Sequence, residues 1–511
     1  MMIRRMHHMR HVGGSSSCIA VVYQQRFASD TRVPARFSRD ARECRARSFS
    51  TPSARAGQDA RPDSASSAEG DGLGSDQTAT HGEKGELRLN GQQVPIDMDM
   101  FFKQDRAEKY RWKYIGSRNP DAPPASEFPA YEPKDFFKFE VLYQSKKSMA
   151  RVGRIHTPHG IVDTPGYVAV GTNAALKGVD HRVADRDAGM QLMFANTLHM
   201  LFHPGPGVVQ AAGGLHKFMN RQMPIITDSG GFQIFSLNHG SVHSEINMKS
   251  GKSKYKKPLL EGVNEYGARI RSYRDNRLMI ITPENSVLAQ KAFGADIIIP
   301  LDELPPYHIS REALEKSVAM THRWEARSLR THLDQINQQA MFGVIHGGID
   351  RELRRRSVDY ITSLPFDGFA VGGSLGKDRD ELITLLEFVM QQLPRDKPCH
   401  LLGIADLESI EQAIPWGVDT FDSCFPTRSG RHGNLFTRRG VINLLRGRYK
   451  SCHEYPDEDP AWRCGDFTLS YLHHLMRAPE QLGPSLATLH NINHMNRSMQ
   501  LYRERILAGE I

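Results

Sequence analysis

The sequence lacks any long hydrophobic run. Its longest apolar stretches have the length of one β-strand, whereas a membrane-spanning helix needs roughly 18 to 20 apolar residues in succession. Cysteine is also scarce, with six residues in a chain of 511. These cysteines are too few and too scattered for a disulfide framework. We therefore expect neither membrane insertion nor a disulfide-stabilised domain, and we expect a reducing compartment.

Most of the chain has no excess of positive or negative side chains, although the whole sequence carries a net charge of +8. Residues 1–57 hold eleven arginines, no lysine and three acidic residues, so the rest of the chain holds 55 basic and 55 acidic side chains. Overall charge therefore gives no argument for nucleic acid binding, and any RNA contact must come from local basic patches.

The amino-terminal arm, residues 1–57, is rich in arginine and serine and poor in acids. This composition is typical of a mitochondrial presequence, with a disordered basic tail of a cytoplasmic protein as the alternative. Residues 58–84, rich in Ser, Ala, Gly, Asp and Thr, are typical of a flexible linker. We expect the folded part to begin near residue 85.

Eight short apolar runs recur from residue 165 onward, each followed by a polar or glycine residue and then by a helix-like stretch. Buried parallel strands that alternate with helices have this pattern, and eight such units predict a (β/α)8 barrel, with a doubly wound open sheet as the lesser alternative. The runs are 167–171, 191–196, 224–228, 296–303, 341–348, 368–373, 400–406 and 418–422.

The surrounding segments complete the predicted organisation. Apolar residues at spacings of three and four predict outer helices over 311–335 and 380–393. The lysine-rich segment 240–273 is predicted to be an insertion. We predict an amino-terminal extension over 85–147, a catalytic barrel over 148–449 and a carboxyl-terminal helical subdomain over 450–511.

Active sites of barrel enzymes lie at the carboxyl ends of the strands, so the polar residues at those positions are candidates. Three aspartates each follow apolar residues there: Asp228, Asp302 and Asp422. One such aspartate alone could simply cap the next helix, but three together indicate a converging acidic site. The other candidates at strand ends are Asn196, His199, Ser229, Glu303, His346, Gly372, Gly373 and Asp406.

Two carboxylates across a pocket suit chemistry at an anomeric carbon. One of them can attack C1′ while the other handles the proton of the leaving group. The same pair could also hold a divalent metal ion, and the residue types alone leave both possibilities open.

Five sequence blocks resemble the tRNA-guanine transglycosylases, also called queuine tRNA-ribosyltransferases, in the order in which that family carries them. The resemblance covers about residues 148–508. The blocks are ITDSGGFQIFSL (226–237), GADIIIPLDE (294–303), GFAVGG (368–373), VDTFDSCFPTRSGRHG (418–433), and YLHHL with TLHN (471–475 and 488–491).

The resemblance implies a role for each matching residue. Asp422 would be the nucleophile that attacks ribose C1′ and forms a covalent RNA intermediate, and Asp228 would be the general acid and base for the departing and incoming bases. Asp302 would bind the base edge, Gly373 would supply backbone contacts, and Phe232 would stack on a flipped base. The pocket set implied in this way is Ser229, Gly230, Gly231, Phe232, Asp302, His346 and Gly373.

The block that follows Asp422 implies contact with tRNA at the wobble position of the anticodon. Arginine beside glycine is suited to phosphate contact, although such pairs also occur as solvated surface. The residues implied to bind RNA are Thr427, Arg428, Ser429, Gly430 and Arg431.

The chain departs from the family pattern in the base pocket and in the zinc motif. In the pocket, Leu304 stands where relatives carry Cys or Val, and the stretch after Gly373 is one residue shorter than in bacterial relatives. His346 stands where relatives carry a base-pocket Gln, and imidazole cannot present the paired donor and acceptor of an amide. The family's zinc motif keeps Cys464 and His490, but its first two cysteine positions align with Asp459 and Ala461. A structural zinc site needs four ligands, so we expect a lost or weakened site, with Cys452, His453 or Asp459 as conceivable substitutes.

The sequence thus favours a mitochondrial enzyme that exchanges guanine at position 34 of tRNA for queuine or a related 7-deazaguanine, without an organic cofactor and as a homodimer or a heterodimer with a paralogous subunit. One alternative is a non-catalytic tRNA-binding subunit of a heteromeric transglycosylase. Another is a metal-dependent barrel hydrolase, for which the His-x-His strand signature is missing.

Overall fold

The computed structural model describes residues 88–89, 92–93, 99–102, 105–239 and 259–511. The predicted arm and linker, residues 1–84, lie outside the described residues, as does 240–258 of the predicted insertion. Within the described part, no helix has the length and apolar character needed to cross a membrane.

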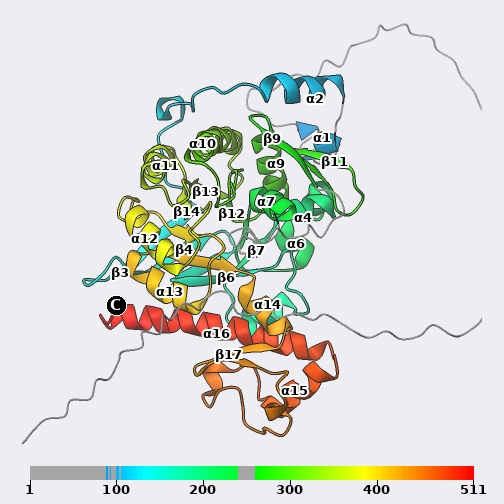
Figure 1. The fold of residues 1–511 in the computed structure, drawn as a ribbon, viewed down its shortest axis with the longest axis vertical. Coiled ribbons are helices and arrows are strands. Elements are labelled where there is room, and N and C mark those ends of the chain that lie inside the picture. The colour runs from blue at the N-terminus through cyan, green and yellow to red at the C-terminus, as the bar shows by residue number, and fades with distance from the viewer. Residues whose placement is uncertain (1–87, 90–91, 94–98, 103–104, 240–258) are drawn as a thin grey trace, which may run out of the picture. The chain divides into compact units, whose positions relative to one another are not determined.

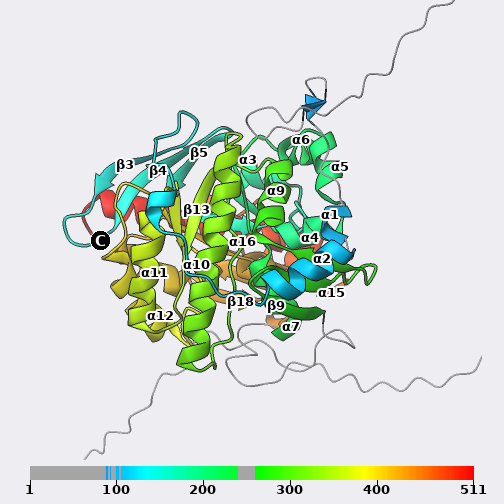
Figure 2. The ribbon, with the colours of Figure 1, turned by 90° about the horizontal axis from the view of Figure 1, so that it is seen from above.

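Eight parallel strands close into a barrel in the order β12-β13-β14-β15-β16-β6-β7-β8 (Figures 1 and 2). All eight predicted runs form these strands, so the predicted (β/α)8 barrel is confirmed. The strands are β6 (Gly166–Val170), β7 (Leu192–Ala195), β8 (Ile225–Thr227), β12 (Ile297–Ile298), β13 (Ala340–Ile345), β14 (Gly368–Val371), β15 (Cys399–Leu401) and β16 (Thr420–Ser423).

The barrel interior is a packed apolar core, because alternate residues of each strand point inward. Branched and aromatic side chains from six strands form it: Val168, Leu192, Phe194, Ile226, Ile297, Ala340, Phe342, Val344 and Ala370. Ile155 and Val162 of an antiparallel sheet join the same cluster. That sheet consists of β3 (Lys138–Gln144), β4 (Arg151–Thr157) and β5 (Gly160–Thr164), and β5 leads directly into β6. It therefore closes the amino-terminal end of the barrel.

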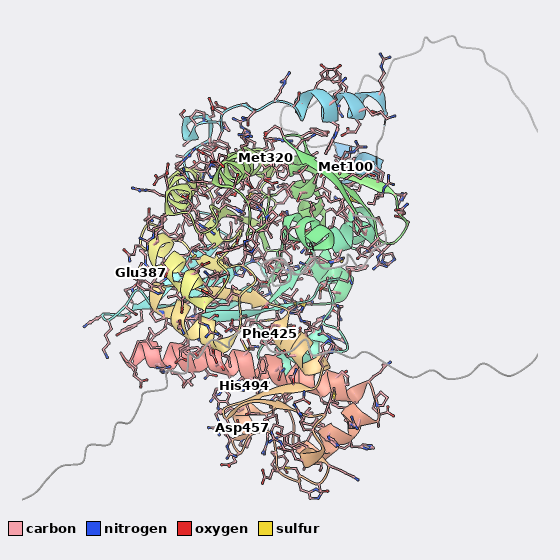
Figure 3. The ribbon with its side chains drawn as sticks, in the orientation of Figure 1. Met100, Met320, Glu387, Phe425, Asp457 and His494 are labelled. Carbon is pink, nitrogen blue, oxygen red and sulfur yellow. The ribbon has the colours of Figure 1, made fainter. Side chains whose placement is uncertain are left out.

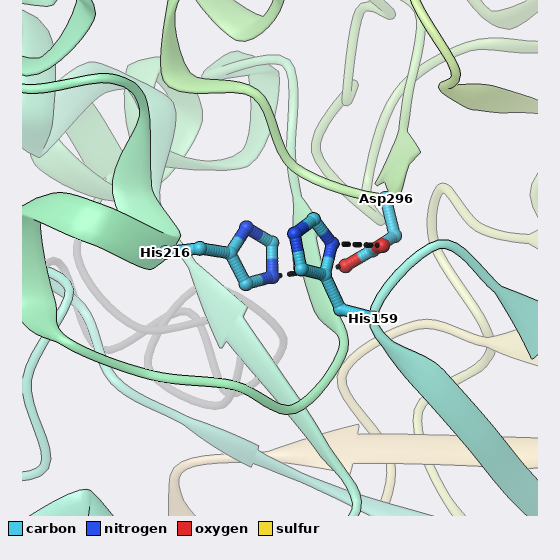
Figure 4. Close-up of side chains that lie close together, drawn as sticks. All are labelled: His159, His216 and Asp296. Atoms are coloured by element: carbon cyan, nitrogen blue, oxygen red, sulfur yellow. Dashed lines mark hydrogen bonds and ion pairs between the residues drawn. The ribbon is translucent and has the colours of Figure 1, made fainter.

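A hydrogen-bonded group of three residues ties this closed end together (Figure 4). Asp296, just before β12, contacts His159 from the β4–β5 turn at 2.8 Å and His216 at 3.2 Å, and it accepts a hydrogen bond from the backbone N–H of Ile225 at 2.8 Å. The two imidazole rings stack, with centroids 3.4 Å apart. Burial raises the pKa of Asp296, but its histidine and backbone partners outweigh this effect and hold that pKa well below its usual range.

Helices surround the strands, and their ends follow local sequence signals. α9 begins at a capping box formed by Thr282 and Asn285 and ends at Gly294 in the left-handed conformation, and α10 begins at Ser310, whose hydroxyl caps Ala313 N. The helices are α3 (His181–Asp187), α4 (Thr197–Phe202), α5 (Pro206–Ala211), α6 (Leu215–Met219), α7 (Gly231–His239), α9 (Pro283–Phe293), α10 (Arg311–Asp334), α11 (Arg351–Ser363), α12 (Arg379–Met390), α13 (Leu407–Ala413) and α14 (Phe425–Arg431). Both predicted outer helices are present as α10 and α12.

Two further segments flank the barrel. The insertion ends in an antiparallel sheet of β9 (Leu260–Asn264), β10 (Gly267–Arg271) and β11 (Leu278–Ile281), so it extends beyond the predicted residue 273. Ahead of β3 lie the short elements β1 (Arg88–Leu89), β2 (Gln92–Gln93), α1 (Asp99–Phe102), α2 (Arg106–Tyr110), η1 (Arg111–Ile115) and η2 (Ala125–Glu127). The predicted boundary at residue 148 falls in the turn between β3 and β4.

The carboxyl-terminal segment is organised by one long helix, α16 (Leu482–Leu507), which runs along the barrel (Figure 1). Gly430 of α14 packs against it so closely that an added Cβ would lie 2.7 Å from the carbonyl oxygen of Ala487. The other elements after the barrel are β17 (Asn434–Thr437), β18 (Gly440–Asn443), η4 (Gly447–Tyr449), η5 (Pro460–Trp462) and α15 (Leu469–Arg477). One short element of the barrel, η3 (Ile414–Trp416), connects α13 to β16.

Candidate active site

Asp228 follows β8 and is buried, and three donors hold its carboxylate. Thr197 N donates to Oδ1 at 2.7 Å, while Asn196 Nδ2 and Gln233 Nε2 donate to Oδ2 at 2.6 and 2.5 Å. Burial raises the pKa of Asp228 to about 6, although these three hydrogen bonds act in the opposite direction. A carboxyl group with this pKa can release or take up a proton near neutral pH.

Asp422 lies in β16, and its carboxylate is held in a different way. Both of its donors contact the same oxygen: His400 Nε2 lies 3.1 Å from Oδ1, and Gly403 N lies 2.8 Å from Oδ1. No donor among the described residues contacts Oδ2. The side chain thus combines a fixed orientation with one oxygen that is free to react.

Asp302 follows β12 and joins two other predicted pocket residues. Ser229 Oγ donates to Oδ1 at 3.1 Å, and His346 Nε2 lies 3.0 Å from Oδ2. Because Ser229 directly follows Asp228 in the chain, its bond to Asp302 brings the two carboxylates to the same part of the barrel. The negative charge of Asp302 also contributes to the raised pKa of Asp228.

Two glycines are needed for this close packing. A Cβ on Gly231 would lie 2.5 Å from both the carbonyl oxygen and Oδ1 of Asp302. Gly373 has a φ of +74°, and a Cβ there would lie 2.8 Å from His346 Nδ1. The structure therefore brings Ser229, Gly231, Asp302, His346 and Gly373 together, on loops that follow four barrel strands.

An arginine that the sequence analysis did not single out holds two of these loops. The guanidinium of Arg354 on α11 is buried and donates to the carbonyl oxygens of Ile345, Gly348, Gly372 and Ser374 at 2.6 to 2.9 Å. Burial lowers its pKa to about 9. Because these carbonyls flank His346 and Gly373, Arg354 fixes the loops that carry both residues.

The remaining pocket candidates have other surroundings. Phe232 on α7 is 49% exposed, and Gly230, just before that helix, has a φ of +95°. His199 contacts Tyr273 Oη at 2.7 Å, and the backbone N–H of Glu303 donates to Thr321 on α10. Asp406 accepts from Ser409 N at 3.0 Å and caps α13, so it has the helix-capping role that a strand-end aspartate can also have.

The five residues implied to bind RNA lie on α14 directly after Asp422. Thr427, Ser429 and Gly430 are buried, Arg431 is half-buried and Arg428 is exposed. Asn491 of α16 donates to the carbonyl oxygen of Pro426 at 2.9 Å and helps to hold α14 in place. Among the five, only the two arginines present side chains that could reach a phosphate.

The two retained zinc-motif residues do not fit a four-ligand site. In the described part of the chain, neither Cys464 nor His490 belongs to a group of three or more His, Cys, Asp or Glu residues that could together hold a metal ion. Of the conceivable substitutes, Asp459 caps η5 through Ala461 N, and His453 Nδ1 contacts Ser470 Oγ at 3.3 Å.

Several aromatic rings pack together in the carboxyl-terminal segment. His494 on α16, labelled in Figure 3, lies 5.0 Å from Trp462 and 6.1 Å from Phe436 between ring centroids. Phe436 in turn lies 5.8 Å from Phe425. Asp457, labelled in the same view, accepts from Arg438 Nε at 2.8 Å.

Among the residues that the structure describes, one group of three could by proximity hold a metal ion: His159, His216 and Asp296, whose ligand atoms lie within 4.8 Å of one another. Its geometry does not favour coordination. The two rings are nearly parallel, at 9°, and an ion could not lie in both ring planes, where the imidazole lone pairs point. The group is better explained as a set of polar contacts that stabilises the closed end of the barrel.

Comparisons with known proteins agree with the geometry of the site. Residues 145–511 match the family model described as Queuine tRNA-ribosyltransferase. A protein of that name from Protochlamydia amoebophila is 54% identical over 374 residues, which cover 73% of this chain and 95% of the relative. Proteins of the same name from Chlamydia caviae and Chlamydia felis are 48% and 46% identical, each over 73% of this chain and 99% of the relative. This chain therefore belongs to the queuine tRNA-ribosyltransferase family.

Proposed function

We propose that this chain, a pentosyltransferase by its family, exchanges guanine at the wobble position of tRNA for queuine or a related 7-deazaguanine, through a covalent enzyme–RNA intermediate. The observation that carries the proposal is the contrast between two aspartates at the carboxyl ends of barrel strands. Asp422 has one oxygen without a donor, whereas both oxygens of Asp228 accept hydrogen bonds.

This contrast assigns the two chemical roles. Oδ2 of Asp422 attacks ribose C1′ while the bond from C1′ to the base nitrogen breaks and its electron pair leaves with guanine. Guanine takes up a proton as it leaves, and the incoming base gives up a proton before it attacks C1′ and releases Asp422. Asp228, with a pKa of about 6, supplies and receives these protons.

Base binding is proposed for the group around Asp302. Guanine and 7-deazaguanines present adjacent N–H donors, which suit the carboxylate of Asp302. Ser229 and His346 hold that carboxylate from the protein side and fix its direction. The exposed ring of Phe232 is placed to stack on a flipped base.

RNA binding is proposed for Arg428 and Arg431, which lie a few residues after the nucleophile. Their proximity to Asp422 suits contacts with the phosphates that flank the flipped nucleotide. Because residues 58–511 together carry no net charge, this local pair has to supply phosphate contacts that the overall charge does not.

Incorporation of labelled guanine into tRNA tests the proposal. We expect the Asp422→Asn variant to lose exchange and to form no covalent complex. Asp406→Asn is the matched control, because Asp406 also follows a barrel strand but caps α13, and asparagine is an equally good cap. Undiminished exchange by Asp422→Asn would refute the proposed role of that residue.

The alternative function, a non-catalytic subunit of a heteromeric enzyme, draws its support from the altered zinc motif. The three donors to Asp228 and the fixed Oδ1 of Asp422, beside an Oδ2 without a donor, favour a catalytic chain. Exchange by the purified single chain would exclude the alternative, and exchange only after addition of a second subunit would support it.

We also propose that residues 1–57 direct the protein to mitochondria, on the basis of their arginine-rich, acid-poor composition. Fusion of these residues to a fluorescent protein tests this, because a cytoplasmic signal would contradict it. A homodimer or a heterodimer with a paralogous subunit remains the proposed assembly, and light scattering of the purified chain would test whether it forms a homodimer.

A further inference from the structure

His400 is a buried histidine on β15 that contacts the proposed nucleophile directly. Its backbone pairs with Thr420 on the neighbouring strand β16. Because side chains two residues apart lie on the same face of a strand, Thr420 and Asp422 both face the imidazole. Nδ1 lies 2.8 Å from Thr420 Oγ1, and Nε2 lies 3.1 Å from Asp422 Oδ1.

The two contacts define which nitrogen carries the proton. A carboxylate can only accept, so Nε2 carries the hydrogen that it donates to Asp422 Oδ1. In a neutral imidazole Nδ1 is then an acceptor, and the Thr420 hydroxyl donates to it. The ring is fixed further by Phe194 of β7, whose centroid lies 6.2 Å away in a stacked orientation.

We propose that His400 is a positioning residue that holds Oδ1 of Asp422 and thereby selects Oδ2 as the oxygen that attacks ribose. The inference rests on the proposed function, because it concerns the same reaction. His400 and Gly403 N draw the lone pairs of Oδ1 into hydrogen bonds, and Oδ2 keeps its lone pairs for C1′. The new Oδ2–C1′ bond forms as the bond from C1′ to the base breaks, and His400 keeps its proton throughout.

Substitutions at His400 separate positioning from packing. Leucine fills similar space without a donor, whereas the terminal amide of glutamine can donate from about the position of Nε2. We expect His400→Leu to lower kcat for guanine exchange on the order of 10- to 100-fold with KM for tRNA and for guanine unchanged, since small displacements of a reacting group have effects of that size. His400→Gln should recover most of that loss.

Thr420 provides a second, milder test of the same arrangement. Thr420→Val removes the donor to Nδ1 and should lower kcat without changing KM, whereas Thr420→Ser keeps the hydroxyl and should lose less of kcat than the valine variant. His332→Leu is the control for loss of a buried histidine, because His332 lies on α10 away from the site. We expect it to leave kcat unchanged.

The crystal structure of a trapped wild-type RNA adduct gives the most specific result. We expect the ester to involve Oδ2, with Oδ1 still bonded to His400 and Gly403. An ester through Oδ1, wild-type kcat in His400→Leu, or equal loss in the leucine and glutamine variants with a lowered melting temperature would each overturn the proposal. If the wild-type chain forms no adduct on Asp422, the proposed function itself fails, which is a distinguishable outcome.

Discussion

Replacing Asp228 by asparagine should change the stability of the protein in a way that depends on pH. Burial raises the pKa of this carboxyl group from 3.8 to about 6. The ionised form is therefore disfavoured in the folded state, and wild-type stability falls as the pH rises through the interval between these two values. A shift of about two pKa units destabilises the folded state by about 3 kcal/mol at pH values well above 6. At pH 4.5 the same shift destabilises it by only about 1 kcal/mol.

Asparagine removes this titration and can keep most of the local contacts. Its carbonyl oxygen can accept from Thr197 N, and its amide can donate to Oε1 of Gln233, a buried atom without a partner, once Gln233 turns its own amide. The stability of Asp228→Asn relative to wild type should hence be greater at pH 8 than at pH 4.5 by about 2 kcal/mol.

Thermal unfolding followed by intrinsic fluorescence measures this difference. For the folded unit Lys84–Ile511, an unfolding entropy of about 2.1 cal/mol/K per residue converts 2 kcal/mol into roughly 2 °C in Tm. Asp180→Asn is the control, because the Arg182 side chain and backbone lower the pKa of Asp180 to about 2 and its titration is nearly complete below pH 4.5. An equal Tm shift for Asp228→Asn at both pH values would refute the reasoning.

Three further outcomes follow from other contacts. Arg354→Met leaves four loop carbonyls without their donor, and we expect KM for guanine to rise on the order of 10-fold in steady-state exchange with a smaller change in kcat; an unchanged KM would contradict this. Gly373→Ala places a Cβ 2.8 Å from His346 at a φ of +74°, so we expect it to lower Tm and weaken guanine binding in calorimetry, whereas unaltered binding would show that the loop relaxes freely. Dialysis against a strong chelator should leave Tm unchanged because Cys464 and His490 lack further ligands, and release of one zinc per chain with a fall in Tm would contradict that view.

Much of the fold was predictable because the barrel strands are buried on both faces. Their sequences are continuous apolar runs, and the polar residue that ends each run marks the carboxyl end of the barrel. This logic located Asp228, Asp302, His346 and Asp422 correctly at strand ends. It also included Asp406, because a capping aspartate and a functional aspartate follow a strand in the same way, and the contacts with Ser409 N and Arg379 become visible only in the structure.

The residues that support the site were harder to predict. His400 is the first residue of the apolar run 400–406 and looks like a core residue until the register of β15 and β16 places it beside Asp422. Arg354 belongs to the run RELRRR, which resembles a solvated basic helix face, although its guanidinium is buried under two loops. Both depend on contacts between segments far apart in the chain, which periodicity does not report.

In the carboxyl-terminal segment, too, contacts between distant parts of the chain could not be predicted from the sequence. The altered zinc motif was visible in the sequence as missing cysteines. That Trp462 and His494 come together with Phe436 depends on how α16 crosses β17 and η5, and no local pattern specifies that crossing.

Identification of the residue that carries RNA during exchange tests the proposed chemistry most directly. The wild-type chain would be denatured while it turns over tRNA, digested with nuclease and protease, and analysed by mass spectrometry. We expect a ribose-linked fragment on the peptide that contains Asp422, and its loss in Asp422→Asn. An adduct on Asp228 or on any other residue, or full exchange by Asp422→Asn, would contradict the assignment of Asp422 as the nucleophile.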